Sequence, residues 1–233
     1  MMRKPLLNQK TQVENLGSNK TDEAIVAVKG LLSLVPIVGS ILAEIIAFQI
    51  PNQRIDRLEN FTKLLAEKFD YMDDLVREKL EEKLKAPQSL PFLEKVLKQV
   101  IESETEQYRL YLASVVKNGL IKDADAIKRD RLLSIVGELN EVEILRLYGA
   151  SLEQYTNNER FSNFFDKYED VIYGDDTKFD PTEEELEIEE MLLSYGQNLV
   201  KMGLTTNTHS DAKATSLGKA VLKFIDAEEN IKI

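Results

Sequence analysis

The 233-residue chain has no cysteine, no tryptophan and a single histidine, His209. Without cysteine, the chain cannot form a disulfide scaffold, a thiolate metal site or a cysteine nucleophile. One histidine also excludes metal ligation by several histidines and a proton relay between two of them. These absences remove most catalytic options, so we expect no enzymatic activity, no bound metal and no cofactor.

Recognisable phosphate-binding and hydrolase motifs are missing too. The sequence contains no G-x-x-x-x-G-K-[ST], no G-x-G-x-x-G after a strand, no H-E-x-x-H and no G-x-S-x-G. Residues 176–187 place carboxylates at positions one, five and twelve of a calcium loop. Lys178 at position three and Pro181 at position six, where such a loop needs glycine, argue against a calcium site. We expect His209, in a polar turn, to be an exposed surface residue.

The net charge of -11 is unevenly distributed. Residues 1–123 carry 18 basic and 18 acidic side chains, whereas residues 124–233 carry 12 basic and 23 acidic ones. Nine carboxylates lie between Asp175 and Glu190, with only Lys178 to offset them. Because a surface this acidic repels a phosphate backbone, we do not expect nucleic acid as a partner. The acidic run is explained either as a solvated loop and helix start or as a surface for a basic partner.

The N-terminal segment divides into a polar part and an apolar part. Residues 1–20 lack periodicity and are predicted to form a flexible arm. They do not resemble a signal peptide, because the apolar run starts late and no small-residue cleavage pattern follows it, so we expect a cytoplasmic protein. Residues 21–50 are predicted to be helical, with a kink where Pro36 lacks an amide hydrogen. Their apolar part, residues 30–50, is a candidate interaction or membrane segment, represented by Leu32, Pro36, Val38, Gly39, Ile41 and Ile45.

Two long amphipathic helices are predicted next, over residues 51–85 and 91–120. The first carries an apolar residue every three or four positions: Ile55, Leu58, Phe61, Leu65, Phe69, Met72, Val76, Leu80 and Leu84. The break at 85–91 contains two prolines, and so short a connection favours an antiparallel hairpin. We therefore predict a helical bundle domain over residues 21–123, in which the apolar segment packs on this hairpin.

Residues 124–233 are predicted to form a second α-helical domain. Helices are expected from about Asp125, from an Asn140/Glu143 capping box, over 158–172, and over 182–202. Thr182 and Glu185 form a second capping box, which places much of the acidic segment 175–190 on the first turn of the last of these helices. A helix that stops at Gly203, a strand-like TTN, a polar turn, KAT and a helix from Ser216 predict a winged-helix-like unit with a short β-ribbon. The predicted fold class is therefore mainly α.

Several segments together resemble the bacterial abortive infection alpha proteins. They are VPIVGSILAEII followed by Arg54 and Arg57, LPFLEKVLKQVIESETEQYRLYLASVV, LLSIVGELNEVEILRLYG, and LVKMGL with TSLGKAVLKFI. The resemblance spans most of residues 25–225. It implies a role in bacterial defence against phage and supplies no catalytic residues.

Three functional hypotheses follow. The first is a non-enzymatic interaction module that self-associates or binds a protein partner through its long helices, unless the 55–84 stripe is buried within the monomer. The second is a membrane-active effector, because residues 30–50 are long enough to span a bilayer after a conformational change, although Glu44 and Pro36 oppose this. The third is a winged-helix DNA-binding regulator, which the acidic charge of helix 182–202 disfavours.

Overall fold

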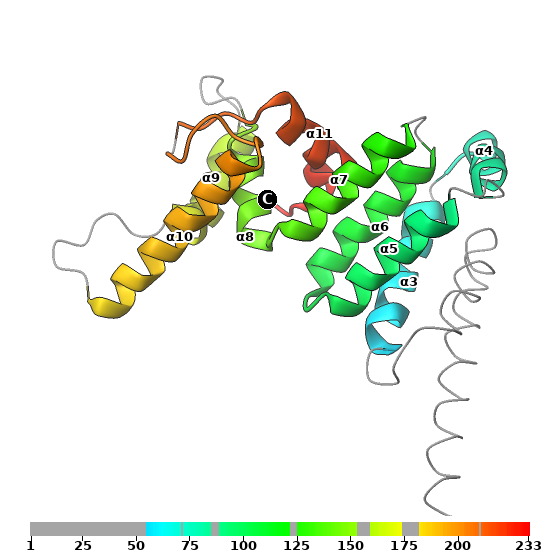
Figure 1. The fold of residues 1–233 in the computed structure, drawn as a ribbon, viewed down its shortest axis with the longest axis horizontal. Helices are drawn as coiled ribbons and strands as arrows, with labels where there is room; N and C mark the ends of the chain where they lie inside the picture. The colour runs from blue at the N-terminus through cyan, green and yellow to red at the C-terminus, as the bar shows by residue number, and fades with distance from the viewer. Residues whose placement is uncertain are drawn as a thin grey trace, which may run out of the picture. The chain divides into compact units, whose positions relative to one another are not determined.

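The computed structural model describes residues 55–70, 72–84, 89–121, 125–152, 159–173, 182–209 and 211–233. These residues are mainly α-helical and contain no strand, as predicted for the fold class (Figure 1). The helices are α3 (Ile55–Asp70), α4 (Asp74–Leu84), α5 (Ser89–Glu102), α6 (Glu106–Ile121), α7 (Ala126–Glu138), α8 (Glu141–Gly149), α9 (Glu159–Tyr173), α10 (Glu183–Lys201), α11 (Ser216–Phe224) and α12 (Ala227–Asn230).

The chain divides into two compact units, residues 1–109 and 110–233, and α6 begins in the first and continues in the second. The boundary that we predicted at residues 123/124 falls in the connection between α6 and α7, where residues 122–124 lie outside the described ranges. The predicted arm 1–20 and the candidate segment 30–50, with Leu32, Pro36, Val38, Gly39, Ile41 and Ile45, also lie outside the described residues.

In the first unit, α3 packs against α5. The apolar stripe of α3 is buried there, as Leu58, Phe61, Leu65 and Phe69 show. A hydrogen bond from Arg57 Nη1 to the carbonyl of Ile101 (2.6 Å) also joins the two helices. The N-terminal half of the predicted interaction stripe is therefore already occupied by packing within the unit.

The predicted continuous helices 51–85 and 91–120 are wrong, because each is interrupted. The first breaks between the end of α3 at Asp70 and the start of α4 at Asp74, and the aspartates at 73 and 74 favour such a boundary because aspartate has a low helix propensity. The second breaks between α5 and α6, where Ser103 Oγ donates to the Val100 carbonyl (2.6 Å) and Thr105 Oγ1 accepts from the Tyr108 amide (3.1 Å). Such short polar side chains bind nearby backbone groups and so compete with the helical ladder.

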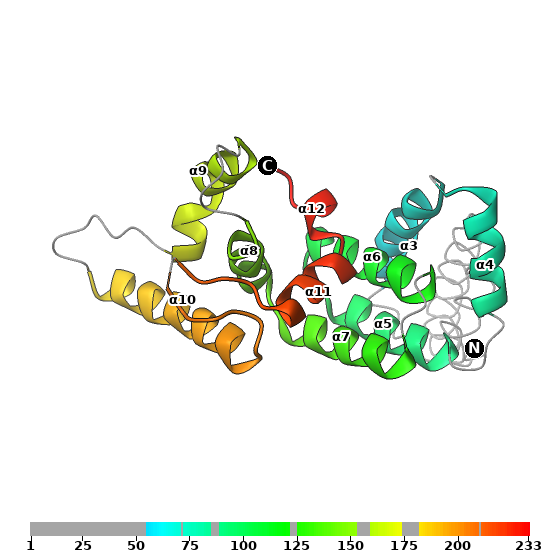
Figure 2. The same ribbon diagram turned by 90° about the horizontal axis from the view of Figure 1, so that it is seen from above.

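The second unit confirms the predicted helix starts. Asp125 caps α7, and Asn140 with Glu143 forms a complete capping box at α8. Thr182 with Glu185 forms the same box at α10. Figure 2 shows α8 between α11 on one side and α9 and α10 on the other, and α8 contacts all three helices.

The predicted β-ribbon of a winged helix does not form in the described residues. One antiparallel bridge, between Thr205 and Ala214, replaces it. Beyond this bridge, side chains replace the backbone hydrogen bonds of a β-ribbon. The Lys213 amide donates to Thr206 Oγ1 (3.0 Å) rather than to a backbone carbonyl. Farther out, Asn207 Oδ1 accepts from the His209 amide (2.9 Å), which holds a polar turn instead of a second strand pair.

Candidate functional site

The C-terminal half of α10 is fixed in the second unit by its small and apolar residues. Leu192, Gly196 and Leu199 are buried on one face of the helix. A Cβ on Gly196 would lie 2.8 Å from Nη2 of Arg146, so glycine leaves the space that this guanidinium occupies. One face of the half of α10 that follows Met191 is therefore part of the core.

Arg146 of α8 joins three segments around α10. Its Nη1 donates to the Leu192 carbonyl (2.5 Å) and its Nη2 to the Thr208 carbonyl (2.9 Å), and the guanidinium lies 5.0 Å from the ring centre of Tyr173. Burial lowers the pKa of Arg146 and raises that of Tyr173. A second buried contact runs from Asn198 Nδ2 to Glu143 Oε1 (2.7 Å).

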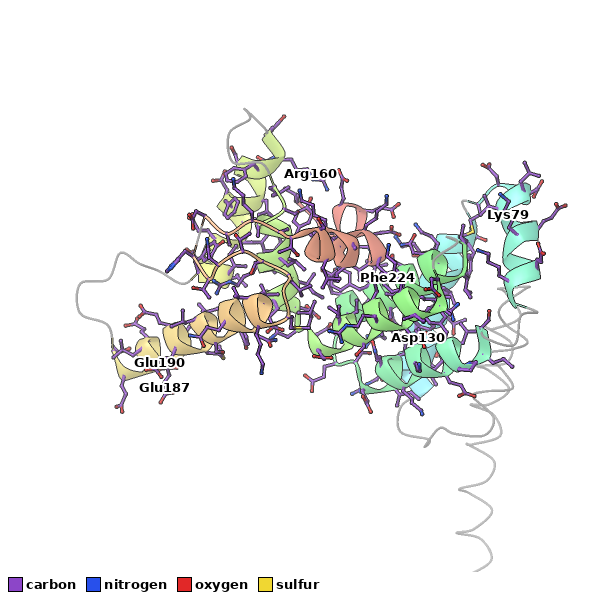
Figure 3. All side chains as sticks on the ribbon, turned by 45° about the horizontal axis from the view of Figure 1, so that its top comes forward. Lys79, Asp130, Arg160, Glu187, Glu190 and Phe224 are labelled. Carbon is purple, nitrogen blue, oxygen red and sulfur yellow. The ribbon has the colours of Figure 1, made fainter. Side chains whose placement is uncertain are left out.

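The N-terminal half of α10, residues 183–191, is mostly exposed to solvent. None of its side chains is buried, and six of the nine are glutamates. The other three, Leu186, Ile188 and Met191, are 45–47 % exposed. We call residues 183–191 the acidic half of α10. Figure 3 shows Glu187 and Glu190 near its free end, projecting away from the rest of the unit.

An exposed apolar row runs along the whole of α10. Leu186, Leu193 and Val200 are spaced by seven residues, and they are 46 %, 49 % and 37 % exposed. Side chains seven residues apart lie on the same face of a helix, two turns from one another. We call these three residues the Leu186 row. It lies beside the buried face, so packing of α10 in the unit leaves it uncovered.

A pocket of about 860 Å³ lies elsewhere in the second unit. Its walls come from the end of α8 and the turn after it, from α9, and from α11 and α12. Tyr148, Arg160, Lys219 and Lys223 are its principal polar and cationic groups. Arg160 reaches from α9 toward the α11–α12 segment, where it hydrogen-bonds to Glu228 (Figure 3).

The turn between α11 and α12, which bears part of the pocket wall, is held by α6. Asn118 Nδ2 donates to the carbonyl of Phe224 (2.9 Å) and to Asp226 Oδ1 (2.9 Å). Asp226 has a left-handed backbone (φ 47°), and its other carboxylate oxygen lies 2.6 Å from Nζ of Lys117. These contacts offset the strain of a left-handed aspartate and fix the position of the turn.

The sequence indicated the acidic run 175–190 as a possible surface for a basic partner, but it did not indicate the Leu186 row or the pocket. His209 is exposed, as expected. The Leu186 row could have been found from its spacing of seven residues, whereas the pocket unites residues from positions 148 to 229 that no local pattern connects. In the part of the chain that the structure describes, no group of three or more metal-ligating side chains occurs, and no helix is long and apolar enough to cross a bilayer.

Comparisons with models of protein families, with curated proteins and with solved structures found no match to this chain.

Proposed function

We propose that this chain is a non-enzymatic protein-interaction module, and that the acidic half of α10 together with the Leu186 row binds a basic amphipathic helix of a partner protein. The observation that carries the proposal is the exposure of apolar side chains along a helix end that is otherwise glutamate. The apolar stripe along residues 55–84, which the sequence also suggested as an interaction surface, is a weaker candidate. Its residues Leu58, Phe61 and Leu65 are buried, and α3 packs on α5.

The fold explains only some of the negative charge on α10. The Thr182/Glu185 box satisfies backbone amides, and glutamates in the first turn interact favourably with the helix dipole. Glu187, Glu189 and Glu190 lie beyond that turn, and in the described residues they form no ion pair or hydrogen bond. They stand three or four residues from other glutamates, a spacing at which like charges each cost about 0.2–0.5 kcal/mol.

A cationic partner would reverse this repulsion. A helix with apolar residues at a spacing of seven would pack along the Leu186 row, in the manner of helix recognition by i, i+4 and i+7 anchors. Its lysine or arginine side chains would then meet Glu189 and Glu190, which flank the row. Charge complementarity of this kind gives specificity and speeds association. Self-association through the same surface would instead place six glutamates of one copy against six of another.

The same charge argues against DNA as the partner. In a winged helix the element before the wing enters the major groove, and α10 precedes the segment that we expected from the sequence to form the wing. Its exposed glutamates would face the phosphates. The membrane-active alternative depends on residues 30–50, which lie outside the described residues, and it stays a prediction.

Direct binding to a defined probe tests the proposal. The probe is a fluorescein-labelled helical peptide of leucine and lysine heptads, and its anisotropy is followed as the full chain is added. We expect binding that weakens as salt is raised, because salt screens exposed charges. The Leu186→Gln/Leu193→Gln variant should lose at least about tenfold in affinity, which corresponds to 1.4 kcal/mol.

Two control variants make this result specific. Ile127→Gln/Leu217→Gln alters two exposed apolar side chains elsewhere in the same unit and should bind like the parent. Glu187→Gln/Glu190→Gln should weaken binding more than Glu102→Gln/Glu104→Gln, which removes the same charge at another exposed site. Equal binding by the Leu186→Gln/Leu193→Gln variant and the parent would reject the surface. Sedimentation equilibrium showing dimers that this variant abolishes would replace the basic partner with a second copy.

The resemblance to abortive infection alpha proteins adds a proposed context, defence against phage in a bacterial cell. Induced expression of the chain in a bacterial host should lower the plating efficiency of phages in a challenge panel. Loss of that protection in the Leu186→Gln/Leu193→Gln variant would show that the defence role depends on the Leu186 row. Unchanged plating of every phage in the panel would reject the defence role and leave the binding result to stand by itself.

A further inference from the structure

The pocket in the second unit has a size typical of small-molecule sites. Its volume of about 860 Å³ lies within the range of about 300–1,000 Å³ seen for such sites. Leu152, Leu222 and Ala227 give it an apolar wall. The ring of Tyr148 adds to this wall, and the tyrosine as a whole is only 4 % exposed. The pocket therefore offers room and apolar surface for an organic body larger than an inorganic ion.

The three acidic groups of the pocket pair with two cations, Arg160 and Lys117. Glu228 accepts from Arg160 Nη1 (3.2 Å), and Arg160 also donates to the Glu228 carbonyl. Asp226 lies 2.6 Å and Glu229 3.7 Å from Nζ of Lys117, which stands behind the α11–α12 turn. These two cations offset two of the three negative charges, and with Lys219 and Lys223 the positive charges around the pocket exceed the negative ones by one.

Two other lysines of the pocket have no carboxylate partner among the described residues. Lys219 and Lys223 lie four residues apart on α11, so their side chains leave the same face of the helix. Neither ammonium group forms an ion pair or a side-chain hydrogen bond within the described residues. Two adjacent positive charges at the edge of an apolar pocket cost free energy unless an anion joins them.

Tyr148 supplies a third donor. Its hydroxyl oxygen accepts a hydrogen bond from Arg160 Nε (2.8 Å), which leaves its own O–H to donate. Burial raises the pKa of Tyr148, so the hydroxyl keeps its proton at neutral pH. The buried hydroxyl and the two ammonium groups are all hydrogen-bond donors, and they line one pocket.

We propose that this pocket binds a small organic phosphate monoester, with its phosphate on Lys219, Lys223 and Tyr148 and its organic part against Leu152 and Leu222. A phosphate monoester carries a charge of about -1.5 to -2 at pH 7, which two lysines balance. Its oxygens accept the charge-assisted hydrogen bonds that these donors can form. This site is separate from α10 and does not depend on the proposed partner surface.

Titration of the full chain with phenyl phosphate, inorganic phosphate and benzyl alcohol tests the proposal. The measurement is isothermal calorimetry, supported by the melting temperature followed by circular dichroism. We expect phenyl phosphate to bind more tightly than inorganic phosphate, because only the first can use the apolar wall, and we expect benzyl alcohol to bind weakest. The affinity for phenyl phosphate should fall as salt is raised.

Variants distinguish the pocket from a general attraction of anions to lysine. Lys219→Gln/Lys223→Gln should lower the affinity for phenyl phosphate about tenfold or more, a change of 1.4 kcal/mol per factor of ten. Lys128→Gln/Lys213→Gln removes two exposed lysines outside the pocket and should bind like the parent. Tyr148→Phe should weaken phosphate binding while leaving benzyl alcohol unaffected. Equal losses in the two lysine pairs, or no heat and no melting shift with millimolar phenyl phosphate, would overturn the proposal.

Discussion

Replacement of Gly218 by alanine should destabilise the second unit, although alanine is the better helix former. Gly218 lies in the first turn of α11, and a Cβ there would stand 2.3 Å from the Leu204 carbonyl oxygen. The same Cβ would lie 2.9 Å from Cδ1 of Leu147. A leucine methyl can rotate away, but the carbonyl belongs to the backbone. The close approach of α11 to residue 204 therefore requires glycine.

The backbone at Leu204 is held from both sides. Its amide donates to the Leu199 carbonyl (2.9 Å), and its carbonyl accepts from the Thr215 amide (2.9 Å). An added methyl group forces residue 204 or α11 to move and strains both bonds. Overpacking costs about 1–3 kcal/mol and each weakened hydrogen bond about 0.5–1.5 kcal/mol, whereas alanine gains about 1 kcal/mol over glycine. The net loss expected for Gly218→Ala is therefore about 3 kcal/mol.

Urea unfolding followed by circular dichroism at 222 nm measures this loss, and hydrogen exchange of residues 216–224 assigns it to α11. Gly203→Asn is the matched control. Gly203 has a φ of 72° and no heavy atom within 4 Å of its added Cβ, and asparagine tolerates that conformation. The control should lose less than Gly218→Ala. Stability of Gly218→Ala equal to or above that of the parent would mean that helix propensity dominates, and the reasoning from the Leu204 contact would be refuted.

Three further changes should act through contacts described above. Arg146→Met should cost about 2–4 kcal/mol in urea unfolding because charge-assisted bonds to two carbonyls are lost, and Arg146→Lys should recover only part of this. Thr182→Ala should speed hydrogen exchange at the start of α10 and cost about 1 kcal/mol there, since it removes one half of a capping box. Burial raises the pKa of Tyr173, so its unfolded form loses a proton first and stability should fall as pH rises above about 10. Urea unfolding across that pH range should show a smaller fall in Tyr173→Phe.

Helix starts could be predicted because a few adjacent residues determine them. The Asn140/Glu143 and Thr182/Glu185 boxes each exchange side-chain and backbone hydrogen bonds over three residues, and both were read correctly from spacing. The start of α11 follows the same logic, since Thr215 Oγ1 accepts from the Gly218 amide (3.1 Å). No tertiary information is needed for contacts this short.

The helix interruptions could not be predicted from apolar periodicity. Phe69, Met72 and Val76 keep the spacing of a single amphipathic helix across the break between α3 and α4. Apolar periodicity shows only which side chains face the core. The spacing is unchanged when a short turn between two helices leaves the same side facing the core. Between α5 and α6, local hydrogen bonds of Ser103 and Thr105 to the backbone accompany the break instead. The β-ribbon failed for a similar reason, because polar side chains between residues 205 and 214 satisfy backbone groups that a strand pair would use.

The pocket depends on approach between distant segments, so its lysines look ordinary in the sequence. Lys219 and Lys223 read as the polar face of a short amphipathic helix. Their position beside Tyr148 follows from the packing of α11 on α8, which the small residue Gly218 permits. The sequence predicts the helix from Ser216 but does not indicate that this helix lines a pocket.

The carboxylates of the second unit separate into two classes, and the separation distinguishes folding from function. Glu143 and Asp226 are bonded to side chains of other helices, so their replacement by amides should lower the free energy of unfolding. Glu187 and Glu190 have no such contact within the described residues, and their mutual repulsion means that replacement should leave stability unchanged or raise it slightly. A rise in stability when Glu187 and Glu190 are replaced by glutamine would support the proposed partner surface, whereas a loss of stability would assign these glutamates a structural role.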